Sequence, residues 1–359
     1  MQNNPEIRKL DLLDRKILLE LDMNSRMSLA EVGKNLRIGK NNVQYRLARM
    51  MEDGVIKRFS TMVSNAKLGF FLGKFYLQMS GFASRAEEEA FYKEIMENKN
   101  IGWIARCEGR WDLMLGIYAT DISQLNDFKL DLFMKHEEHI NSYDLVFTAE
   151  GAVAQRSYLV HKERKLIVPK KKVGEFIGKG KAELDEIDKR ILLAIANDAR
   201  YNYVQLGKEL RLNPMTVQKR ITKMERDGVI NGYVAFLDYN KIGVGFYKVC
   251  FYLKDYKEKY KEFLDYCLQL PNVIHHMETL GTWEVELELE TESVQEFYDV
   301  VKEIRDRFSD IIKKTEFAII TDEMKLELVP QMLLEKDEAK GTHPNPTKLK
   351  PLSTPINPV

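Results

Sequence analysis

Two stretches of the sequence decide the fold, because they are near copies of each other. Residues 10–22 read LDLLDRKILLELD, and residues 184–196 read LDEIDKRILLAIA. Further along each copy, the same four letters, DGVI, occur at residues 53–56 and again at residues 227–230. A duplicated pattern of this kind predicts that one structural module is present twice in the chain.

The duplication extends well beyond these motifs. Residues 10–69 and 184–243 align without a gap at an offset of 174, and about a third of the aligned positions are identical. The similarity continues more weakly, where GRWD at residues 109–112 meets GTWE at residues 281–284. With 359 residues, the chain is long enough for several domains, and the repeat predicts two equivalent sets.

Charge is unevenly distributed over the two copies. The chain as a whole has 55 basic and 55 acidic side chains, which is unusual for a nucleic-acid-binding protein. Residues 1–65 nevertheless carry a net charge of about +4 and residues 184–240 about +1, whereas residues 241–330 carry about −7. The positive charge therefore lies at the start of the first copy, where a DNA-binding segment is expected.

The three cysteines are too sparse to form a disulfide framework or a zinc site. No stretch resembles a signal peptide or approaches the roughly 20 apolar residues of a membrane span. We therefore expect a cytoplasmic protein, and the motifs predict no metal and no cofactor.

The first part of each copy has the pattern of a helix-turn-helix. Apolar residues at helical spacing predict a helix over residues 11–22, and Ser28 with Glu31 forms a capping box that begins a second helix. A third helix is expected over residues 40–53, with its copy over residues 214–227, each followed by an extended wing strand.

The outward face of this third helix carries amide and basic side chains, which can pair with base edges and phosphates in a major groove. A solvated helix face would look similar, but the two copies share glutamine and arginine at equal positions. The predicted DNA-contacting residues are Lys40, Asn41, Asn42, Gln44, Tyr45, Arg46, Arg49, Thr216, Gln218, Lys219, Arg220 and Lys223.

The second part of each copy predicts the strand and helix order β-α-β-β-α-β, which is typical of a ferredoxin-like domain. The fold class is therefore α+β. The expected boundaries are residues 1–65 and 184–240 for the winged helix-turn-helix units, 66–169 and 241–334 for the ferredoxin-like domains, 170–183 for a linker and 335–359 for a disordered tail.

This sequence resembles the Lrp/AsnC family of transcription regulators, also called feast/famine proteins. The resemblance rests on the helix-turn-helix ending in Asp-Gly-Val-Ile, the wing and the Gly-x-aromatic-acidic turn, in order and twice. It implies a regulator that binds double-stranded DNA, assembles through its α/β domains and binds an amino acid or similar small molecule near that turn. The sequence departs from the family at Gly39 and Asn213, where a serine is usual, and at Trp111 and Trp283, where a tyrosine is usual.

The resemblance also implies where an effector would bind. An alternative stays open, because tight turns need glycine whatever their function and the tryptophans could simply pack. The residues that the resemblance assigns to the effector site are Gly109, Trp111, Asp112, Gly281, Trp283 and Glu284.

One duplicated chain could supply both halves of a family dimer. Glu284, Glu286, Glu288 and Glu290 alternate along one face of a predicted strand, and four like charges there disfavour pairing of this copy with itself. We therefore expect a pseudo-dimer in which copy 1 faces copy 2, with further assembly into a homo-oligomer.

Two other functions fit parts of the sequence. Some two-module proteins of this kind are sirohaem decarboxylases, and His275 and His276 upstream of Trp283 offer imidazoles for such chemistry. The chain could also be a small-molecule sensor that has lost DNA binding. The basic residues Arg46 and Arg49 argue against loss of DNA binding, and the strand motif of the decarboxylases is absent. We therefore expect a regulator that is not an enzyme.

Overall fold

The computed structural model describes residues 7–160, 172–175 and 180–334. The predicted tail at 335–359 and part of the predicted linker lie outside the described residues. No helix in the described ranges is long and apolar enough to cross a membrane.

Each helix-turn-helix unit is built from three helices. In the first unit these are α1 (Leu12–Met23), α2 (Leu29–Leu36) and α3 (Lys40–Glu52), and in the second unit α7 (Glu186–Ile195), α8 (Tyr203–Leu210) and α9 (Pro214–Arg226). The predicted capping box is present, because the Ser28 hydroxyl accepts from the backbone N–H of Glu31 while the Glu31 carboxylate accepts from that of Ser28.

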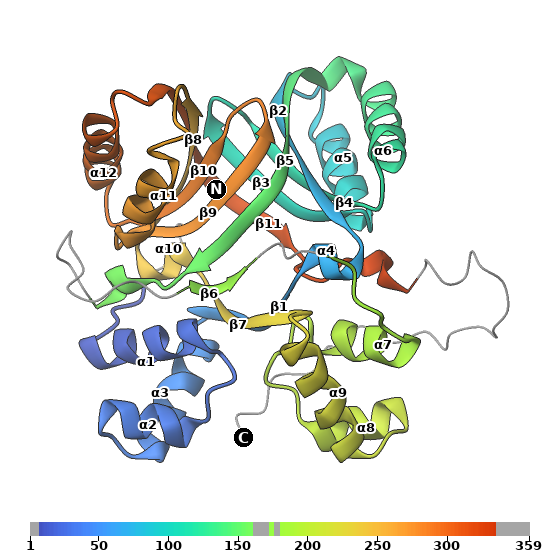
Figure 1. The fold of residues 1–359 in the computed structure, drawn as a ribbon, viewed down its shortest axis with the longest axis vertical. Coiled ribbons are helices and arrows are strands. Elements are labelled where there is room, and N and C mark those ends of the chain that lie inside the picture. Colours follow the sequence, from blue (N-terminus) through green and yellow to red (C-terminus); the bar gives the residue numbers. More distant parts are fainter. Residues whose placement is uncertain (1–6, 161–171, 176–179, 335–359) are drawn as a thin grey trace, which may run out of the picture.

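The strand after each unit pairs across the two copies. β1 (Ile56–Val63) and β7 (Ile230–Leu237) form a two-stranded antiparallel sheet in which Phe59 lies opposite Ala235. The two predicted wings are therefore one shared ribbon, which joins the two helix-turn-helix units beneath the α/β domains (Figure 1). The short helices α4 (Asn65–Leu68) and α10 (Tyr239–Ile242) lead from this ribbon into those domains.

Both α/β domains have the predicted order β-α-β-β-α-β. The first contains β2 (Phe71–Met79), α5 (Arg85–Glu97), β3 (Ile101–Gly109), β4 (Leu113–Ala119), α6 (Ile122–Lys135) and β5 (Ile140–Ala154). The second contains β8 (Gly245–Leu253), α11 (Tyr260–Gln269), β9 (Val273–Gly281), β10 (Val285–Thr291), α12 (Val294–Arg307) and β11 (Ile312–Leu326). The predicted α+β fold class is confirmed.

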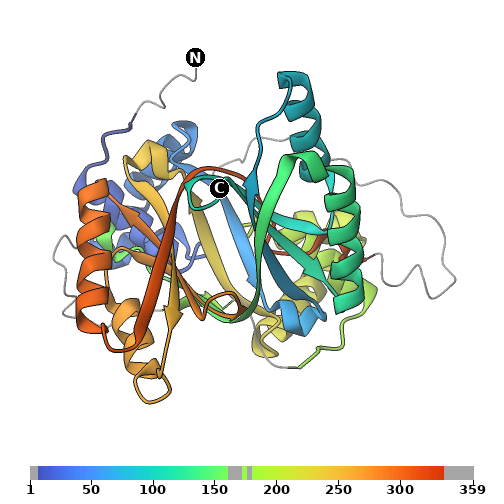
Figure 2. The same ribbon diagram turned by 90° about the horizontal axis from the view of Figure 1, so that it is seen from above.

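The two sheets close on each other. β5 pairs with β2 of its own copy and with β9 of the other, while β11 pairs with β8 and with β3. The last strand of each copy extends beyond its own sheet, because its second half pairs with a strand of the other copy. Seen from above, the helices of the two copies cover opposite sides of the closed, barrel-like sheet (Figure 2).

Part of the predicted linker is ordered. β6 (Lys172–Glu175) adds to the edge of β5 opposite Ala152–Ala154, beside the shared ribbon. Three short 3-10 turns, Glu137–His139, Ser157–Leu159 and Gln331–Leu333, complete the described elements.

Candidate nucleic-acid interface and the core between the copies

The third helix of each unit, α3 or α9, is called the recognition helix below, and the tight turn before it depends on a glycine. A Cβ at Gly33 would lie 2.7 Å from the carbonyl oxygen of Ile38, and a Cβ at Gly207 would lie 2.7 Å from that of Leu212. In both copies the added Cβ would meet a backbone atom, which cannot easily move. Glycine therefore allows the close turn, because it has no Cβ. The second helix then ends at Arg37 or Arg211 in the left-handed conformation. The turns therefore present α3 and α9 in the same way in both copies.

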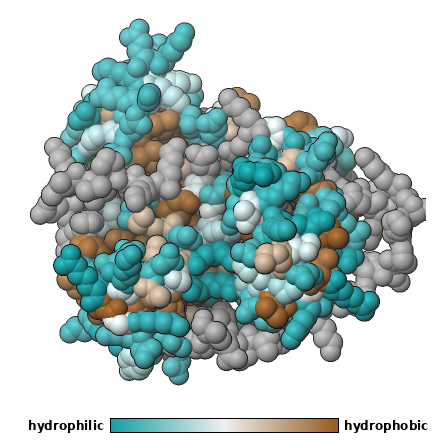
Figure 3. Space-filling view, turned by 60° about the horizontal axis from the view of Figure 1, so that its bottom comes forward, coloured by the Kyte–Doolittle hydropathy of each residue, from teal (hydrophilic) through white to brown (hydrophobic). Residues whose placement is uncertain are grey.

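The second and third helices of both units lie at one end of the molecule. α2, α3, α8 and α9 lie on the side of the shared ribbon away from the barrel (Figure 1). Turned toward the viewer, this end is covered largely by hydrophilic residues (Figure 3). The two helix-turn-helix units of one chain are therefore available on a common face.

Most of the predicted DNA-contacting side chains are accessible on this face. Lys40, Asn41, Asn42 and Tyr45 are exposed in the first copy, while Gln44 and Thr216 are half-buried. Gln218, Lys219 and Lys223 are exposed in the second copy. Asn213 caps the second recognition helix by accepting from the N–H of Met215, whereas Gly39 provides no such side-chain cap.

The arginines of these helices have another role. Arg46 pairs with Asp11 at 2.8 Å and with the buried Asp14 at 2.7 Å, and Arg49 pairs with Asp14 at 2.6 Å. Arg220 makes the two equivalent contacts with Asp185 and Asp188, each at 2.7 Å. These guanidinium groups tie the recognition helix to the first helix of the unit. We therefore expect this internal pairing to be the main role of Arg46 and Arg220, and their contact with DNA stays a prediction.

Sequence reasoning overlooked other cations on the same face. Lys34 and Arg37 in the first copy, and Lys208 and Arg211 in the second, are exposed at the end of the helix before the turn. Their repetition at an offset of 174 was a visible signal. Such side chains suit contacts with phosphates beside the groove.

The predicted effector residues lie at the seam between the two copies. A Cβ at Gly109 would lie 3.1 Å from the carbonyl oxygen of Phe317, and a Cβ at Gly281 would lie 2.5 Å from that of Leu145. Both glycines have positive φ and therefore allow strands of different copies to approach. Asp112 accepts from the N–H of Met79.

The two tryptophans of these turns are buried side by side inside the barrel. Trp111 and Trp283 are each 1% exposed, and their ring centroids are 5.2 Å apart, with Tyr76 packed against both. Glu284 resembles Asp112, since it accepts from the N–H of Leu253. In this geometry the two tryptophans pack against each other and against Tyr76. An effector that bound at these turns would have to displace their rings.

A buried charge cluster crosses the seam beside these rings. The Glu286 carboxylate accepts from Lys74 and Tyr76 of the first copy, and from Trp283 and Lys248 of the second. Burial by itself would raise the pKa of Glu286, but the ammonium groups of Lys248 and Lys74 outweigh this effect and lower that pKa to about 2. The carboxylate therefore stays ionised in the protein interior.

The neighbouring acids of β10 are neutralised in the same manner. Glu288 pairs with Lys248 at 2.7 Å and with His275, and Glu290 pairs with Arg156 of the first copy at 3.0 Å. The predicted row of like charges is therefore compensated from both copies, with Lys74 and Arg156 from the first and Lys248 from the second, and His275 is held by a carboxylate.

The chain is similar to known helix-turn-helix regulators. A family model described as winged helix-turn-helix DNA-binding matches residues 10–57 and 184–231. The regulatory protein AsnC of Haemophilus influenzae is 27% identical over 143 residues, which cover 38% of this chain and 90% of that protein. The chain therefore carries, twice, a module that is similar to the Lrp/AsnC regulators. The match to the HTH-type transcriptional regulator LrpC of Bacillus subtilis is 29% identical over 120 residues, and it covers 33% of this chain and 81% of that protein.

A solved structure with a similar fold matches nearly the whole chain. The crystal structure of the sirohaem decarboxylase NirDL superimposes over 92% of this chain and 98% of its own, with a TM-score of 0.58 and 12% identity. This similarity shows that the two proteins share the arrangement of two modules around a closed sheet.

Proposed function

We propose that this chain is a transcription regulator that recognises specific double-stranded DNA with both of its helix-turn-helix units. The observation that carries the proposal is the placement of α3 and α9 on one face, joined by the β1–β7 ribbon. Two recognition helices held by a two-fold arrangement suit two half-sites on the same side of a duplex. One chain would then do the work of a dimer, and further association of chains would extend the contact.

The two units would contribute unequally to binding. In the first unit, Asn41 and Tyr45 would face base edges, while Lys34, Arg37 and Lys40 would contact phosphates. The second unit offers Gln218 and Lys219, but its segment has a smaller net positive charge. We expect the first unit to supply most of the electrostatic attraction.

An amino-acid-like effector would modulate this binding, as the family resemblance implies. The turns at Gly109 and Gly281 join the copies, so a ligand that shifted them would change the relative position of the two units. Equal DNA affinity in the presence and absence of a bound effector would contradict this part of the proposal.

The test is binding of the purified chain to its own upstream DNA at two salt concentrations, with an unrelated fragment for comparison. We expect tighter, salt-sensitive binding to its own DNA, because phosphate contacts release counterions. Lys40→Ala should reduce the salt slope by about one unit. The matched control is Arg85→Ala, which removes a side chain that is 89% exposed on α5, in the α/β domain. Equal affinity for both fragments would refute specific recognition.

The second candidate is a sirohaem decarboxylase, which the whole-chain fold similarity favours. Against it, the barrel interior is filled by Tyr76, Trp111 and Trp283, with the Glu286 cluster beside them. Addition of sirohaem followed by gel filtration distinguishes the two functions, because a bound tetrapyrrole would carry visible absorbance with the protein. Co-elution together with release of carbon dioxide would support the enzyme.

A further inference from the structure

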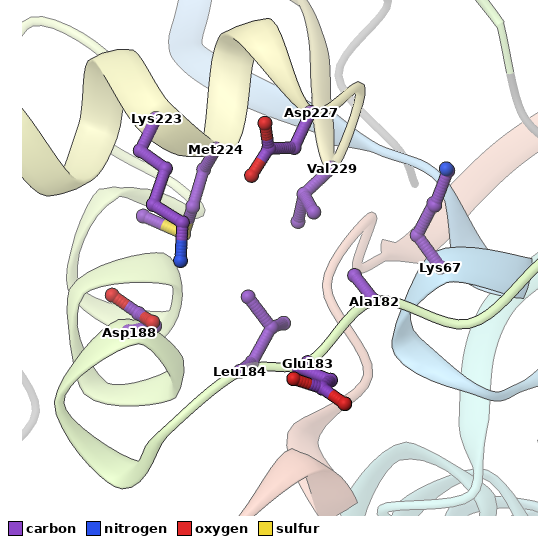
Figure 4. Close-up of a pocket in the computed structure, with 9 residues that line it drawn as sticks. All are labelled: Lys67, Ala182, Glu183, Leu184, Asp188, Lys223, Met224, Asp227 and Val229. Carbon is purple, nitrogen blue, oxygen red and sulfur yellow. The ribbon is translucent and has the colours of Figure 1, made fainter.

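A pocket of about 330 Å³ lies at the base of the second helix-turn-helix unit (Figure 4). Its walls come from the end of α9, the start of α7 with the segment before it, and α4 of the other copy. Ala182, Leu184 and Lys67 line one side, and Asp188, Lys223 and Asp227 line the other (Figure 4). With Glu183 included, the lining has three carboxylates and two ammonium groups, so cations are favoured.

The first copy shows what occupies the equivalent place. The backbone N–H of Ala182 donates to the carbonyl of Lys67 at 2.9 Å, and the N–H of Arg8 donates to the carbonyl of Lys241, also at 2.9 Å. Both pairs are related by the offset of 174 that relates the two copies. The segment entering each helix-turn-helix unit is therefore docked in the same way, and only its side chains differ.

In the first copy the place is filled by an arginine. The Arg8 guanidinium lies 3.4 Å from the carboxylate of Asp53, whose counterpart in the second copy is Asp227. Where Arg8 stands, the second copy has Ala182, which ends at its Cβ. The space between Ala182 and Asp227 is thus the space that a guanidinium side chain spans in the first copy.

The second copy also has no guanidinium at the position of Arg49, on the same wall of the pocket. Arg49 pairs with Asp14 at 2.6 Å in the first copy, but its counterpart Lys223 makes no described ion pair with Asp188 within 4.0 Å. The oxygen of Asp188 that corresponds to the Asp14 oxygen paired with Arg49 is Oδ2. Among the described contacts, this oxygen accepts only from the backbone N–H of Asp185, at 3.4 Å. Asp188 therefore offers a buried acceptor to the pocket.

We infer that this pocket binds a small molecule that carries a guanidinium group, held by Asp227 or Asp188 as Arg8 is held by Asp53 and Arg49 by Asp14 in the first copy. A planar guanidinium donates two parallel hydrogen bonds to a carboxylate, which an ammonium cannot do. Leu184, Met224 and Val229 provide apolar contact for an alkyl stem. A molecule of this class would link α9 to the segment before α7, as Arg8 does for α3. The inference does not depend on DNA binding.

Isothermal titration of the full chain with L-arginine tests the inference, and L-citrulline is the control ligand because it has the same length without the charge. We expect one saturable site for L-arginine, and binding of L-citrulline weaker by about tenfold or more. Absence of saturable binding, or equal binding of the two ligands, would overturn the inference.

Three variants locate the site. Ala182→Arg should fill the pocket from within and abolish binding, and Asp227→Asn should weaken it about tenfold or more without adding bulk. Arg8→Ala combined with Lys9→Glu and Arg49→Lys gives the first copy the pocket residues of the second, so it should open the equivalent pocket and raise the stoichiometry from one to two. Circular dichroism checks that each variant is folded. Unchanged binding by Ala182→Arg and Asp227→Asn would overturn the placement of the site in this pocket, and a stoichiometry that stays at one in the triple variant of the first copy would overturn the equivalence of the two copies.

Discussion

Replacing Glu286 by leucine is expected to destabilise the barrel strongly. The Lys74 side chain is 2% exposed and Glu286 is 0% exposed, and the two come from different copies. Without the carboxylate, the described contacts leave Lys74 only the sulfur of Met277, at 3.1 Å. Lys248 keeps Glu288, so the loss falls on Lys74.

The magnitude follows from leaving one charge of a buried pair behind. Such a change costs about 3–5 kcal/mol, a large part of the roughly 5–15 kcal/mol that stabilises a typical domain. The double variant Glu286→Leu with Lys74→Met removes both charges, and it should regain most of this loss because apolar side chains can replace a buried pair. Tyr76 and Trp283 still lose an acceptor, at 2.6 and 2.9 Å, so recovery should be incomplete.

Urea unfolding followed by tryptophan fluorescence measures these changes. The three tryptophans of the chain, Trp103, Trp111 and Trp283, are all buried in the barrel and report its opening. Lys302→Ala is the control, because its pair with Asp306 is exposed and should contribute less than about 1 kcal/mol. A loss below about 1 kcal/mol in Glu286→Leu, or a double variant no more stable than the single one, would refute the reasoning.

Three further predictions concern stability. Arg46→Ala should lower the free energy of unfolding of the first helix-turn-helix unit by about 1–3 kcal/mol. This loss should be seen as faster hydrogen exchange in α1 and α3, while the salt slope of DNA binding stays unchanged. Gly33→Ala and Gly207→Ala should each lower the melting temperature followed by circular dichroism, because the added Cβ meets a carbonyl oxygen at 2.7 Å. Acid should open the barrel, because the pKa of Glu286 is lowered to about 2 in the folded protein. The stability that this ionised carboxylate contributes is complete above the pKa of about 4.3 that a glutamate has in the unfolded chain. This stability is lost as the pH falls toward 2, and tryptophan fluorescence should change there.

The sequence predicted most of the fold because its signals are local and occur twice. The capping box of Ser28 and Glu31 begins a helix through contacts within four residues, and the glycine of each tight turn repeats with its helix. The alternating acids of β10 even favoured the pairing of unlike copies, which β5–β9 and β3–β11 provide. The sharing of one ribbon by the two wings was missed, because strand pairing between distant segments leaves no local pattern.

The roles of individual side chains were harder to predict. Arg46 has the chemistry and helical position of a DNA contact, but its partner Asp14 lies 32 residues away on another helix. The spacing of Asp11, Asp14 and Arg46 recurs in Asp185, Asp188 and Arg220, so two retained acids together with one retained arginine could have indicated an internal ion pair. The contrast between Arg8 and Ala182 has meaning only once the docked backbone is seen.

Fusion of the two modules explains why the core can be asymmetric. Lys74 and Lys248 occupy equivalent positions, yet the acids that meet them, Glu286 and Glu288, belong to the second copy alone. At the matching places the first copy has methionine and glycine, so a first copy paired with itself would bury two lysines without carboxylates. A second copy paired with itself would bury four of these carboxylates against two lysines. Neither copy balances its own interior, so covalent linkage keeps together two halves that satisfy each other's charges.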